Sequence, residues 1–298
     1  MKQLDLSTII LTFNEELHIR RCLENAFKFS KEVFVIDSFS SDRTCEIATE
    51  MGAVVLRNKW TNHATQLNWG LENAPIKTEW VLRLDADEYL EDDLIEELRS
   101  NLNNEPKDIT GIEFRRKVFF LDKWMKHASP TVYLLRLFRF GKGVCEMRMM
   151  DEHIILSEGQ SKRYKGFFVD YNLFNISWWA KKHIGYSERE AADLLNIEYE
   201  LFSATNNGHL EGQAGNKRKL KNKYAHKALF FRSFAYFIYR YFFKLGILDG
   251  KKGFLWCFMQ AWWYRTLVDI QVYQIKNECG DDKEKIKDYL KNKFGIRM

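Results

Sequence analysis

The sequence is poor in proline and in paired cysteine. It contains 3 proline and 5 cysteine residues among 298. The cysteines are odd in number, widely spaced and without a Cys-x-x-Cys pair, so neither a zinc ribbon nor a disulfide framework is indicated. We therefore expect a reducing, cytosolic compartment. The scarcity of proline leaves little to interrupt long helices.

Long apolar runs are also missing. No window of 18 or more apolar residues is free of charge, so no transmembrane helix is predicted. Asp5 interrupts the first residues, and the apolar run 7–12 is too short for the core of a signal peptide, so we expect none. The hydrophobic content of 46% is nevertheless enough for a sizeable core.

Strand and helix patterns alternate through the first hundred residues. Apolar, β-branched runs predict buried strands at 7–13, 33–36, 53–56 and 80–84. Amphipathic segments predict helices at 17–29, 43–51 and 63–72. Strands separated by such helices form a parallel sheet. Polar residues follow the strands directly, so they should gather at the sheet edge where open α/β folds bind ligands.

The pattern changes beyond residue 110. Strand-like runs without strong helices between them predict a mixed or antiparallel extension at 111–118, 133–140, 153–156 and 164–169. From residue 175 the chain is helical, with one long segment over 177–202 and about three more helices after it. We predict an α/β domain over 1–174 and a helical, basic and aromatic region over 175–298.

Asp85 and Asp87 follow the buried run 80–84. Two carboxylates at positions i and i+2 of an extended chain point to the same side, and Arg83 shares their parity. Such a pair can hold Mg²⁺ or Mn²⁺ together with the oxygens of a substrate diphosphate. The simplest interpretation is a metal-assisted enzyme that acts on a nucleotide diphosphate. The alternative is that these acids only open the helix that starts near Asp92.

Several segments resemble one enzyme family. Residues 8–16 resemble the opening strand of family 2 glycosyltransferases, residues 35–44 resemble their V-D-x-x-S-x-D-x-T segment, and residues 84–88 resemble their D-x-D motif. Gln66 and Asn68 sit where the bacterial subgroup related to lipopolysaccharide core glucosyltransferases carries a Gln-x-Asn. Further segments continue the pattern of that subgroup, at 137–139, 141–143, 151–153 and 246–250.

The resemblance implies a GT-A fold, a nucleotide-sugar donor and inversion at the anomeric carbon. It implies a donor site, with UDP-sugar as the expected donor, bordered by Thr12, Asn14, Glu15, Gln66 and Asn68. Asp37 would accept hydrogen bonds from the uracil or the ribose. The alternatives are that Asp37 only caps a turn or helix and that the Gln-x-Asn pair lies on an exposed helix face.

The resemblance also implies a metal site and a base. Asp87 would ligate Mg²⁺ or Mn²⁺ directly, Asp85 would face the ribose or the metal, and His153 would complete the metal shell or contact the diphosphate. A sugar hydroxyl is a poor nucleophile and needs a general base. Glu152 is the favoured base and Asp151 the second candidate. The alternative is that residues 151–153 form a polar turn before a strand.

The C-terminal region is basic and aromatic. Between residues 216 and 265 there are twelve Lys or Arg, and Asp249 is the only acid. Aromatic rings over 228–248 accompany a stripe of Arg232, Arg240 and Lys244, a combination typical of a helix in a membrane interface. We expect peripheral attachment to an anionic membrane, at the inner face of the cytoplasmic membrane. The alternative is an ordinary helical lid; no motif supports nucleic-acid binding.

The leading functional hypothesis is an inverting, metal-dependent glycosyltransferase that acts on a glycan or lipid-linked acceptor in bacterial surface polysaccharide or lipopolysaccharide synthesis. A sugar-1-phosphate nucleotidyltransferase would need a Gly-rich, Arg-containing phosphate loop after the first strand, and residues 12–15 offer none. A catalytically inactive, membrane-associated assembly factor with the same fold is the third hypothesis, against which the intact Asp85 and Asp87 argue.

Overall fold

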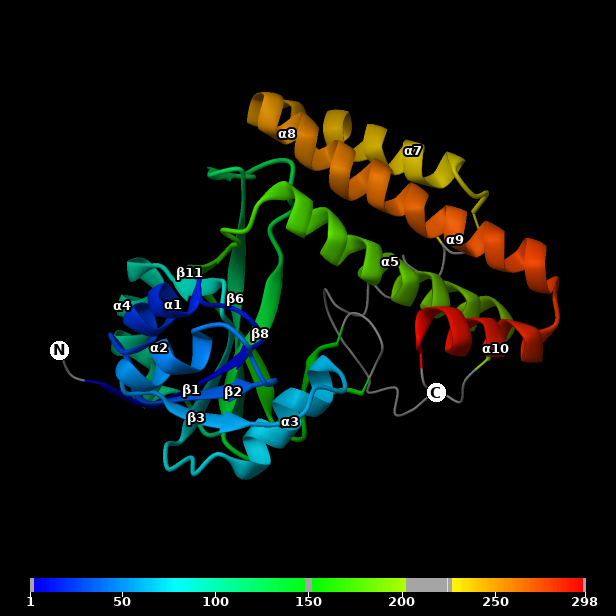
Figure 1. Ribbon diagram of the computed structural model, residues 1–298. Helices are drawn as coiled ribbons and strands as arrows, with labels where there is room; N and C mark the ends of the chain where they lie inside the picture. Colours follow the sequence, from blue (N-terminus) through cyan, green and yellow to red (C-terminus); the bar gives the residue numbers. More distant parts are fainter. Residues whose placement is uncertain (1–2, 148–151, 202–223, 225–226, 297–298) are drawn as a thin grey trace. The chain divides into compact units, whose positions relative to one another are not determined.

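The computed structural model describes residues 3–147, 152–201, 224 and 227–296, and Figure 1 shows its course. The chain divides into two compact units. Among the described residues, unit 1 contains 3–124, 131–147 and 152–173, and unit 2 contains 125–130, 174–201, 224 and 227–296. The functional domains 1–174 and 175–298 stay a prediction.

A nine-stranded sheet forms the middle of unit 1. Four parallel strands make up its first half in the order β3-β2-β1-β4. They are β1 (Leu4–Thr12), β2 (Ser30–Asp37), β3 (Val54–Arg57) and β4 (Trp80–Asp85). The predicted α/β class with a mostly parallel N-terminal half is confirmed.

Helices cover both faces of these strands (Figure 1). One face carries α1 (Ile19–Ala26), α2 (Thr44–Glu50) and α4 (Asp92–Asn101), and the other carries α3 (His63–Asn73). Strand β1 is therefore apolar on both sides. Its Leu6 and Ile10 belong to the first core cluster, and Ile9 and Leu11 to the second. This burial explains why β1 is a continuous apolar run rather than an alternating one.

The second half of the sheet is mixed, as predicted. Strand β8 is antiparallel to β4 and β6, whereas β11 is parallel to β6 and antiparallel to β5. The strands are β5 (Glu88–Leu90), β6 (Ile109–Phe120), β7 (Lys123–Trp124), β8 (Tyr133–Arg139) and β11 (Gln160–Tyr171). A separate hairpin pairs β9 (Gly143–Cys145) with β10 (Ile154–Leu156), and η1 (Leu102–Asn104) follows α4.

Unit 2 is helical, as predicted. Its elements are α5 (Ile176–Tyr199), α7 (Phe231–Ile238), η2 (Tyr239–Phe243), η3 (Gly246–Asp249), α8 (Gly250–Cys257), η4 (Phe258–Trp263), α9 (Tyr264–Cys279) and α10 (Lys283–Phe294). Helices α5, α9 and α10 share one apolar core. In Figure 1, α8 and α9 form one long helical run with α7 alongside it.

A buried ion pair fixes α7 to α9. Arg232 donates through Nη2 to Asp269 Oδ1 at 2.5 Å, and the backbone N–H of Phe230 donates to Asp269 Oδ2 at 2.7 Å. Both charged side chains are almost fully buried. Across the described helices, none has the length and apolar character that crossing a bilayer requires.

Candidate active site

Strands β1, β2 and β4 end at the same edge of the sheet. Thr12 pairs in register with Asp37, and Leu11 lies between Ile36 on one side and Asp85 on the other. Neighbouring strands are about 4.8 Å apart, so the ends of β2 and β4 are separated by about 10 Å across β1. The sequence-predicted convergence of polar residues at one edge is therefore present.

The carboxylate of Asp37 is fully buried. Its Oδ1 accepts hydrogen bonds from Thr12 Oγ1 at 3.0 Å and from Ser40 Oγ at 2.5 Å, and its Oδ2 accepts from the Ser40 backbone N–H at 2.8 Å. These bonds close the loop after β2 on the end of β1. Asp37 thus shapes the edge of the candidate nucleotide site, in line with the turn-capping alternative.

The loop after β1 is held by the loop after β2. Asn14 has a positive φ of 55°, its N–H donates to Ser40 Oγ at 2.8 Å, and its Oδ1 accepts from the Ser41 N–H at 2.8 Å. The Glu15 N–H donates to Thr44 Oγ1 at 2.8 Å. A polar residue such as asparagine tolerates the left-handed conformation, which explains its use in this tight turn.

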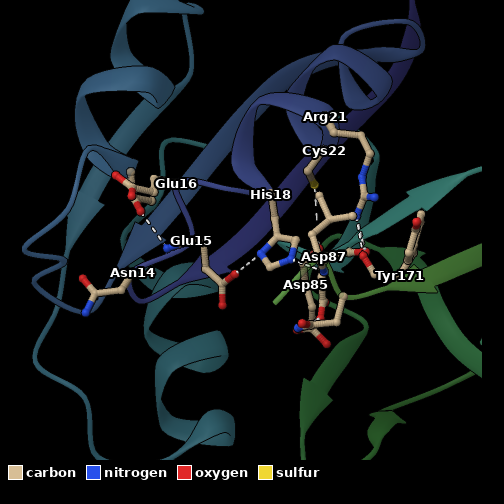
Figure 2. A network of polar contacts seen from close by, with 12 residues as sticks. Asn14, Glu15, Glu16, His18, Arg21, Cys22, Asp85, Asp87 and Tyr171 are labelled. Atoms are coloured by element: carbon tan, nitrogen blue, oxygen red, sulfur yellow. Dashed lines mark hydrogen bonds and ion pairs between the residues drawn. The ribbon is translucent and has the colours of Figure 1, made fainter. Parts of the chain in front are cut away.

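Glu15 is hydrogen-bonded to the buried side chain of His18 (Figure 2). His18 Nδ1 lies 2.6 Å from Glu15 Oε2, and His18 Nε2 accepts the Leu173 backbone N–H at 2.8 Å. The second bond leaves Nε2 without a proton, so Nδ1 carries the proton and donates to the carboxylate. Glu15 is therefore oriented by a chain segment 155 residues away from His18.

The predicted extended geometry of the two aspartates is wrong. Strand β4 ends at Asp85, and Ala86 and Asp87 form a turn. The turn arises because Glu88 reaches back to accept the Asp85 N–H at 2.9 Å, and β5 then starts in a new direction. Asp85 and Asp87 are both half-buried near each other at the sheet edge (Figure 2).

The backbone of Asp87 is anchored by α1 (Figure 2). Arg21 Nη2 donates to the Asp87 carbonyl at 3.1 Å and to the Tyr171 carbonyl at 2.6 Å. The Asp87 side chain accepts one bond through Oδ2, from Asn172 Nδ2 at 3.1 Å. The main chain of Asp87 is thus fixed through its carbonyl group, while its carboxylate accepts a single hydrogen bond.

Cationic side chains surround Asp85. Arg83 Nη2 donates to both carboxylate oxygens of Asp85, at 2.7 and 2.9 Å, and lies 2.5 Å from His63 Nε2. Arg136 Nη2 lies 3.9 Å from Asp85 Oδ2. Burial lowers the pKa of Arg83, but Asp85 and Glu88 more than offset this effect, so the pKa is raised. Arg83 is therefore a fixed positive charge at the end of β4.

Arg136 reaches this place through a bulge. The pairing of β6 with β8 shifts between Ile112 and Glu113, which leaves Arg136 as the extra residue on β8. A bulge re-aims side chains that a regular strand would point elsewhere. The Arg136 guanidinium bonds Glu88 Oε1 at 2.5 Å and lies over the Phe168 ring at 5.0 Å. Its Nε and Nη1 are buried without a hydrogen-bond partner.

Gln66 and Asn68 are tethers on α3. Gln66 is fully buried and donates through Nε2 to Ser38 Oγ at 3.0 Å, so the exposed-face alternative is wrong for this residue. Asn68 donates to the Cys145 carbonyl at 2.9 Å and accepts the Cys145 N–H at 2.8 Å. The first holds the loop after β2, and the second holds the β9–β10 hairpin.

Glu152 lies two residues before the start of β10 in the hairpin and acts electrostatically on Cys145 of β9. Burial raises the pKa of the Cys145 thiol to about 12, Arg83 lowers it, and the carboxylates of Glu152, Glu146 and Asp85 raise it further. The charges at the end of β4 and the charge of the predicted base therefore both act on the pKa of this thiol. Asp151, the second candidate base, lies outside the described residues.

His153 faces the hairpin itself. Its Nδ1 lies 3.1 Å from Oε1 of the buried Glu146, whose N–H donates to the His153 carbonyl at 2.9 Å. Within the described part of the chain, no three His, Cys, Asp or Glu side chains are grouped so as to hold a metal. The assignment of Asp85, Asp87 and His153 to a metal stays a prediction.

The fold is that of an α/β protein with polar residues gathered at the carboxyl ends of parallel strands, and comparison with known proteins adds the family. Residues 7–153 match the family model described as glycosyl transferase family 2. This part of the chain therefore belongs to glycosyl transferase family 2, and the predicted resemblance is confirmed.

Two curated relatives match parts of the chain. An uncharacterized glycosyltransferase of Rickettsia typhi is 36% identical over 93 residues, which are 31% of this chain and 31% of that protein. LpsC, the lipopolysaccharide core biosynthesis glycosyltransferase of Rhizobium meliloti, is 27% identical over 163 residues, 53% of this chain and 59% of that protein. The chain thus spans about a third of the length of the first relative.

Among solved structures, glucosyl-3-phosphoglycerate synthase of Mycobacterium tuberculosis matches with 20% identity and a TM-score of 0.31. The match covers 38% of this chain and 43% of that chain.

The sequence-based interpretation missed several residues of this edge. It did not select His18, His63, Arg21 or Arg136 for any role. Arg83 carried a usable signal, because a charged residue within a buried strand at the parity of Asp85 needs a partner. Arg136 carried none, since the bulge that aims it depends on how β6 and β8 pair.

Proposed function

We propose that the protein is an inverting, metal-dependent glycosyltransferase. It would transfer a sugar from a nucleotide diphosphate donor, UDP-sugar, to a glycan or lipid-linked acceptor in bacterial surface polysaccharide or lipopolysaccharide synthesis. One observation carries the proposal: Asp85 and Asp87 lie at the carboxyl edge of a sheet whose residues 7–153 match glycosyl transferase family 2. The core biosynthesis glycosyltransferase LpsC as a relative supports the choice of acceptor.

The residues present fit a divalent cation that is shared with the donor. Mg²⁺ is commonly held by one or two carboxylates plus substrate phosphates, so a complete set of protein ligands is not required. Asp87 is the direct ligand in this proposal because its carboxylate accepts one hydrogen bond. Asp85 is the outer member, since Arg83 occupies both of its oxygens. The cation would offset the charge that develops on the leaving diphosphate.

Arg83 and Arg136 add fixed positive charge beside the same position. Guanidinium groups bind phosphate oxygens in a planar, often bidentate geometry. Arg136 contacts Glu88 and Asp85 through Nη2, and its Nε and Nη1 are buried without a hydrogen-bond partner. In the proposal these cations lower the energy of the diphosphate in the transition state, where its charge is greatest.

The acceptor hydroxyl is deprotonated by Glu152 in this proposal, with Asp151 as the other candidate. A positioned general base typically contributes about 10²–10⁴-fold to the rate. Glu152 is supported by its electrostatic effect on Cys145, whose pKa also responds to Arg83 and Asp85. The tether from Asn68 to Cys145 would fix the distance between the base and the donor.

The nucleotide would lie along the ends of β1 and β2. Thr12 and Asp37 form the floor, and Asn14 and Glu15 form the neighbouring loop. Gln66 supports this floor through Ser38. We propose that the whole protein works at the inner face of the cytoplasmic membrane, where a lipid-linked acceptor would be found.

The proposal is tested with purified protein, Mn²⁺ and a panel of nucleotide sugars. We expect slow donor hydrolysis with a UDP-sugar, lost in Asp87→Ala while the circular dichroism spectrum is unchanged. An exposed acid offers the matched control, Asp92→Ala, whose side chain is 88% exposed. Absence of turnover and of binding for every donor would favour an inactive assembly factor and contradict the proposal.

A further inference from the structure

Large apolar side chains are exposed along one hairpin of unit 2. The hairpin, residues 231–255, consists of α7, η2, η3 and α8. Phe243 is 75% exposed, Phe231 71% and Leu248 61%. Other exposed members of the same surface are Phe234, Tyr239, Phe242, Leu245, Ile247, Phe254 and Leu255. Contiguous exposure on this scale marks an interaction surface rather than ordinary solvent contact.

The surface is hollowed as well as apolar. One open hollow of about 390 Å³ is lined by Phe231, Phe234, Ala235, Ile238, Tyr239 and Phe243. A second, of about 450 Å³, is lined by Tyr241, Gly250, Lys251, Phe254 and Leu255. Both are walled mainly by carbon, so hydrocarbon would fill them better than water.

The charges of this hairpin have one sign at the surface. Lys244 and Lys251 are exposed and Lys252 is partly exposed. Asp249 is the only acid between residues 227 and 268, and it is buried. Its Oδ2 accepts the N–H groups of His127 at 2.8 Å and Ala128 at 2.7 Å, so its charge is turned into the unit. An anionic partner therefore meets lysines and no exposed acid on this hairpin.

The hairpin is braced so that the exposed rings keep their positions. The buried pair of Arg232 and Asp269 fixes α7 to α9. At the turn, η3 packs against α8 without a side chain between them, because a Cβ on Gly253 would lie 2.3 Å from the Gly246 carbonyl. Phe237 stacks on Tyr241 with ring centroids 5.7 Å apart. A braced apolar surface loses little conformational entropy when it binds.

We propose that residues 231–255 form a docking surface for an anionic phospholipid bilayer. Phe243 is the most exposed ring near the turn and Leu248 the most exposed aliphatic side chain. In this proposal both enter the boundary between headgroups and acyl chains, and Lys244 and Lys251 contact lipid phosphates. Aromatic rings accompanied by lysines favour the headgroup layer of a bilayer. The inference deepens the proposed function, on which it rests for the need of a lipid-linked acceptor.

The test is co-sedimentation of the full-length protein with vesicles. Vesicles of phosphatidylcholine and phosphatidylglycerol in equal parts are compared with vesicles of phosphatidylcholine alone. We expect binding to the anionic vesicles that weakens with added salt, since headgroup attraction is screened. Lys244→Gln/Lys251→Gln should weaken partitioning about thirtyfold, the equivalent of about 1 kcal/mol per lysine. Phe243→Ser/Leu248→Ser should weaken it at least about tenfold.

Matched controls lie elsewhere in unit 2. Lys291→Gln/Lys293→Gln removes the same charge from exposed positions of α10, and Ile184→Ser/Ile270→Ser removes exposed aliphatic groups from α5 and α9. Both should sediment like the wild type. Equal binding of all variants, or no binding of the wild type, would overturn the inference.

Two further outcomes are informative. Self-association that Phe243→Ser/Leu248→Ser abolishes, without vesicle binding, would identify the surface as an interface between copies and overturn the inference. Binding of UDP is measured on the same samples. Retained UDP binding with no vesicle binding rejects the docking surface alone, whereas the reverse pattern rejects the proposed donor site and leaves the docking surface standing.

Discussion

The loop after β2 and the turn after β4 lie at one edge of the same sheet, yet their aspartates are in opposite environments. Asp37 is fully buried and accepts three hydrogen bonds from Thr12 and Ser40. Asp87 is partly exposed and accepts one, from Asn172. A saturated carboxylate stabilises a loop, whereas a carboxylate with free lone pairs can bind a cation.

The difference indicates that one side of this edge has a structural role and the other a ligand-binding role. The β2 side is a rigid floor built by internal hydrogen bonds. The β4 side combines carboxylates with Arg83 and Arg136. A charged ligand that binds there would alter the electrostatic interactions among these side chains. Substitutions of Asp37 and of Asp87 should therefore separate stability from activity.

The largest effect is expected at Asp87. Asp87→Asn removes the charge that would hold the cation and should lower transfer by at least about a hundredfold, since a catalytic metal contributes several kcal/mol. The melting temperature should stay within about 2 °C of wild type, because the asparagine oxygen can still accept the one hydrogen bond from Asn172. Steady-state transfer assays with calorimetry measure both quantities.

Asp92→Asn is the matched control for charge, because Asp92 follows in α4 and is 88% exposed. It should leave transfer unchanged. Equal loss of transfer in both variants would show that general charge, rather than the Asp87 carboxylate, matters.

Asp37→Asn should give the opposite pattern. The amide cannot accept all three bonds, so the buried donors of Ser40 and Thr12 lose partners at a cost of about 2–3 kcal/mol in the free energy of unfolding. Chemical denaturation measures this loss. A variant as stable as the wild type that fails only in nucleotide binding would make Asp37 a direct ligand and remove the distinction between the two sides.

Arg83→Met tests the cationic part of the β4 side. It removes the contacts of Arg83 Nη2 with both carboxylate oxygens of Asp85, and charge-assisted bonds are worth about 1.5–3 kcal/mol. We expect a loss of stability of that size. Arg83→Lys should restore only part of it, because the lysine side chain is shorter and does not place its nitrogen where Arg83 Nη2 lies. Full rescue by lysine would show that point charge alone suffices.

Much of the fold could be predicted from the sequence. The four parallel strands were predicted within three residues of their ends, because β1, β2 and β4 contain apolar runs buried on both faces and the edge strand β3 contains the apolar run Val54-Val55-Leu56. The helical character of the region from 175 also follows from periodicity and the lack of proline. The π-helical segments η2 and η4 were not predicted, since their hydrogen bonding departs from the regular period.

The site was only partly accessible. Which strand ends meet follows from parallel topology, so Asp37 and Asp85 could be placed on one edge. The turn at Asp87 depends on Glu88 capping the Asp85 N–H, and the aim of Arg136 depends on a bulge. The tie between His18 and Leu173 joins residues 155 positions apart. Such long-range contacts leave no local pattern in the sequence.

The smallest effect is expected at Asn68. Asn68→Ala removes the paired bonds to the Cys145 backbone and should lower stability by about 1–2 kcal/mol, or roughly 2–8 °C in melting temperature. UDP affinity should change little if Asn68 acts as a tether. A large loss of UDP affinity with unchanged melting temperature would make Asn68 a direct donor contact.

The most direct test is UDP binding with and without a divalent cation. With Mn²⁺, UDP at about 100 times its dissociation constant should stabilise the wild-type protein by about 2.7 kcal/mol. We predict that this stabilisation disappears with a chelator and in Asp87→Asn, and persists in Asp92→Asn. Equal stabilisation by UDP in the presence of chelator, or in Asp87→Asn, would contradict a cation shared between the β4 edge and the diphosphate.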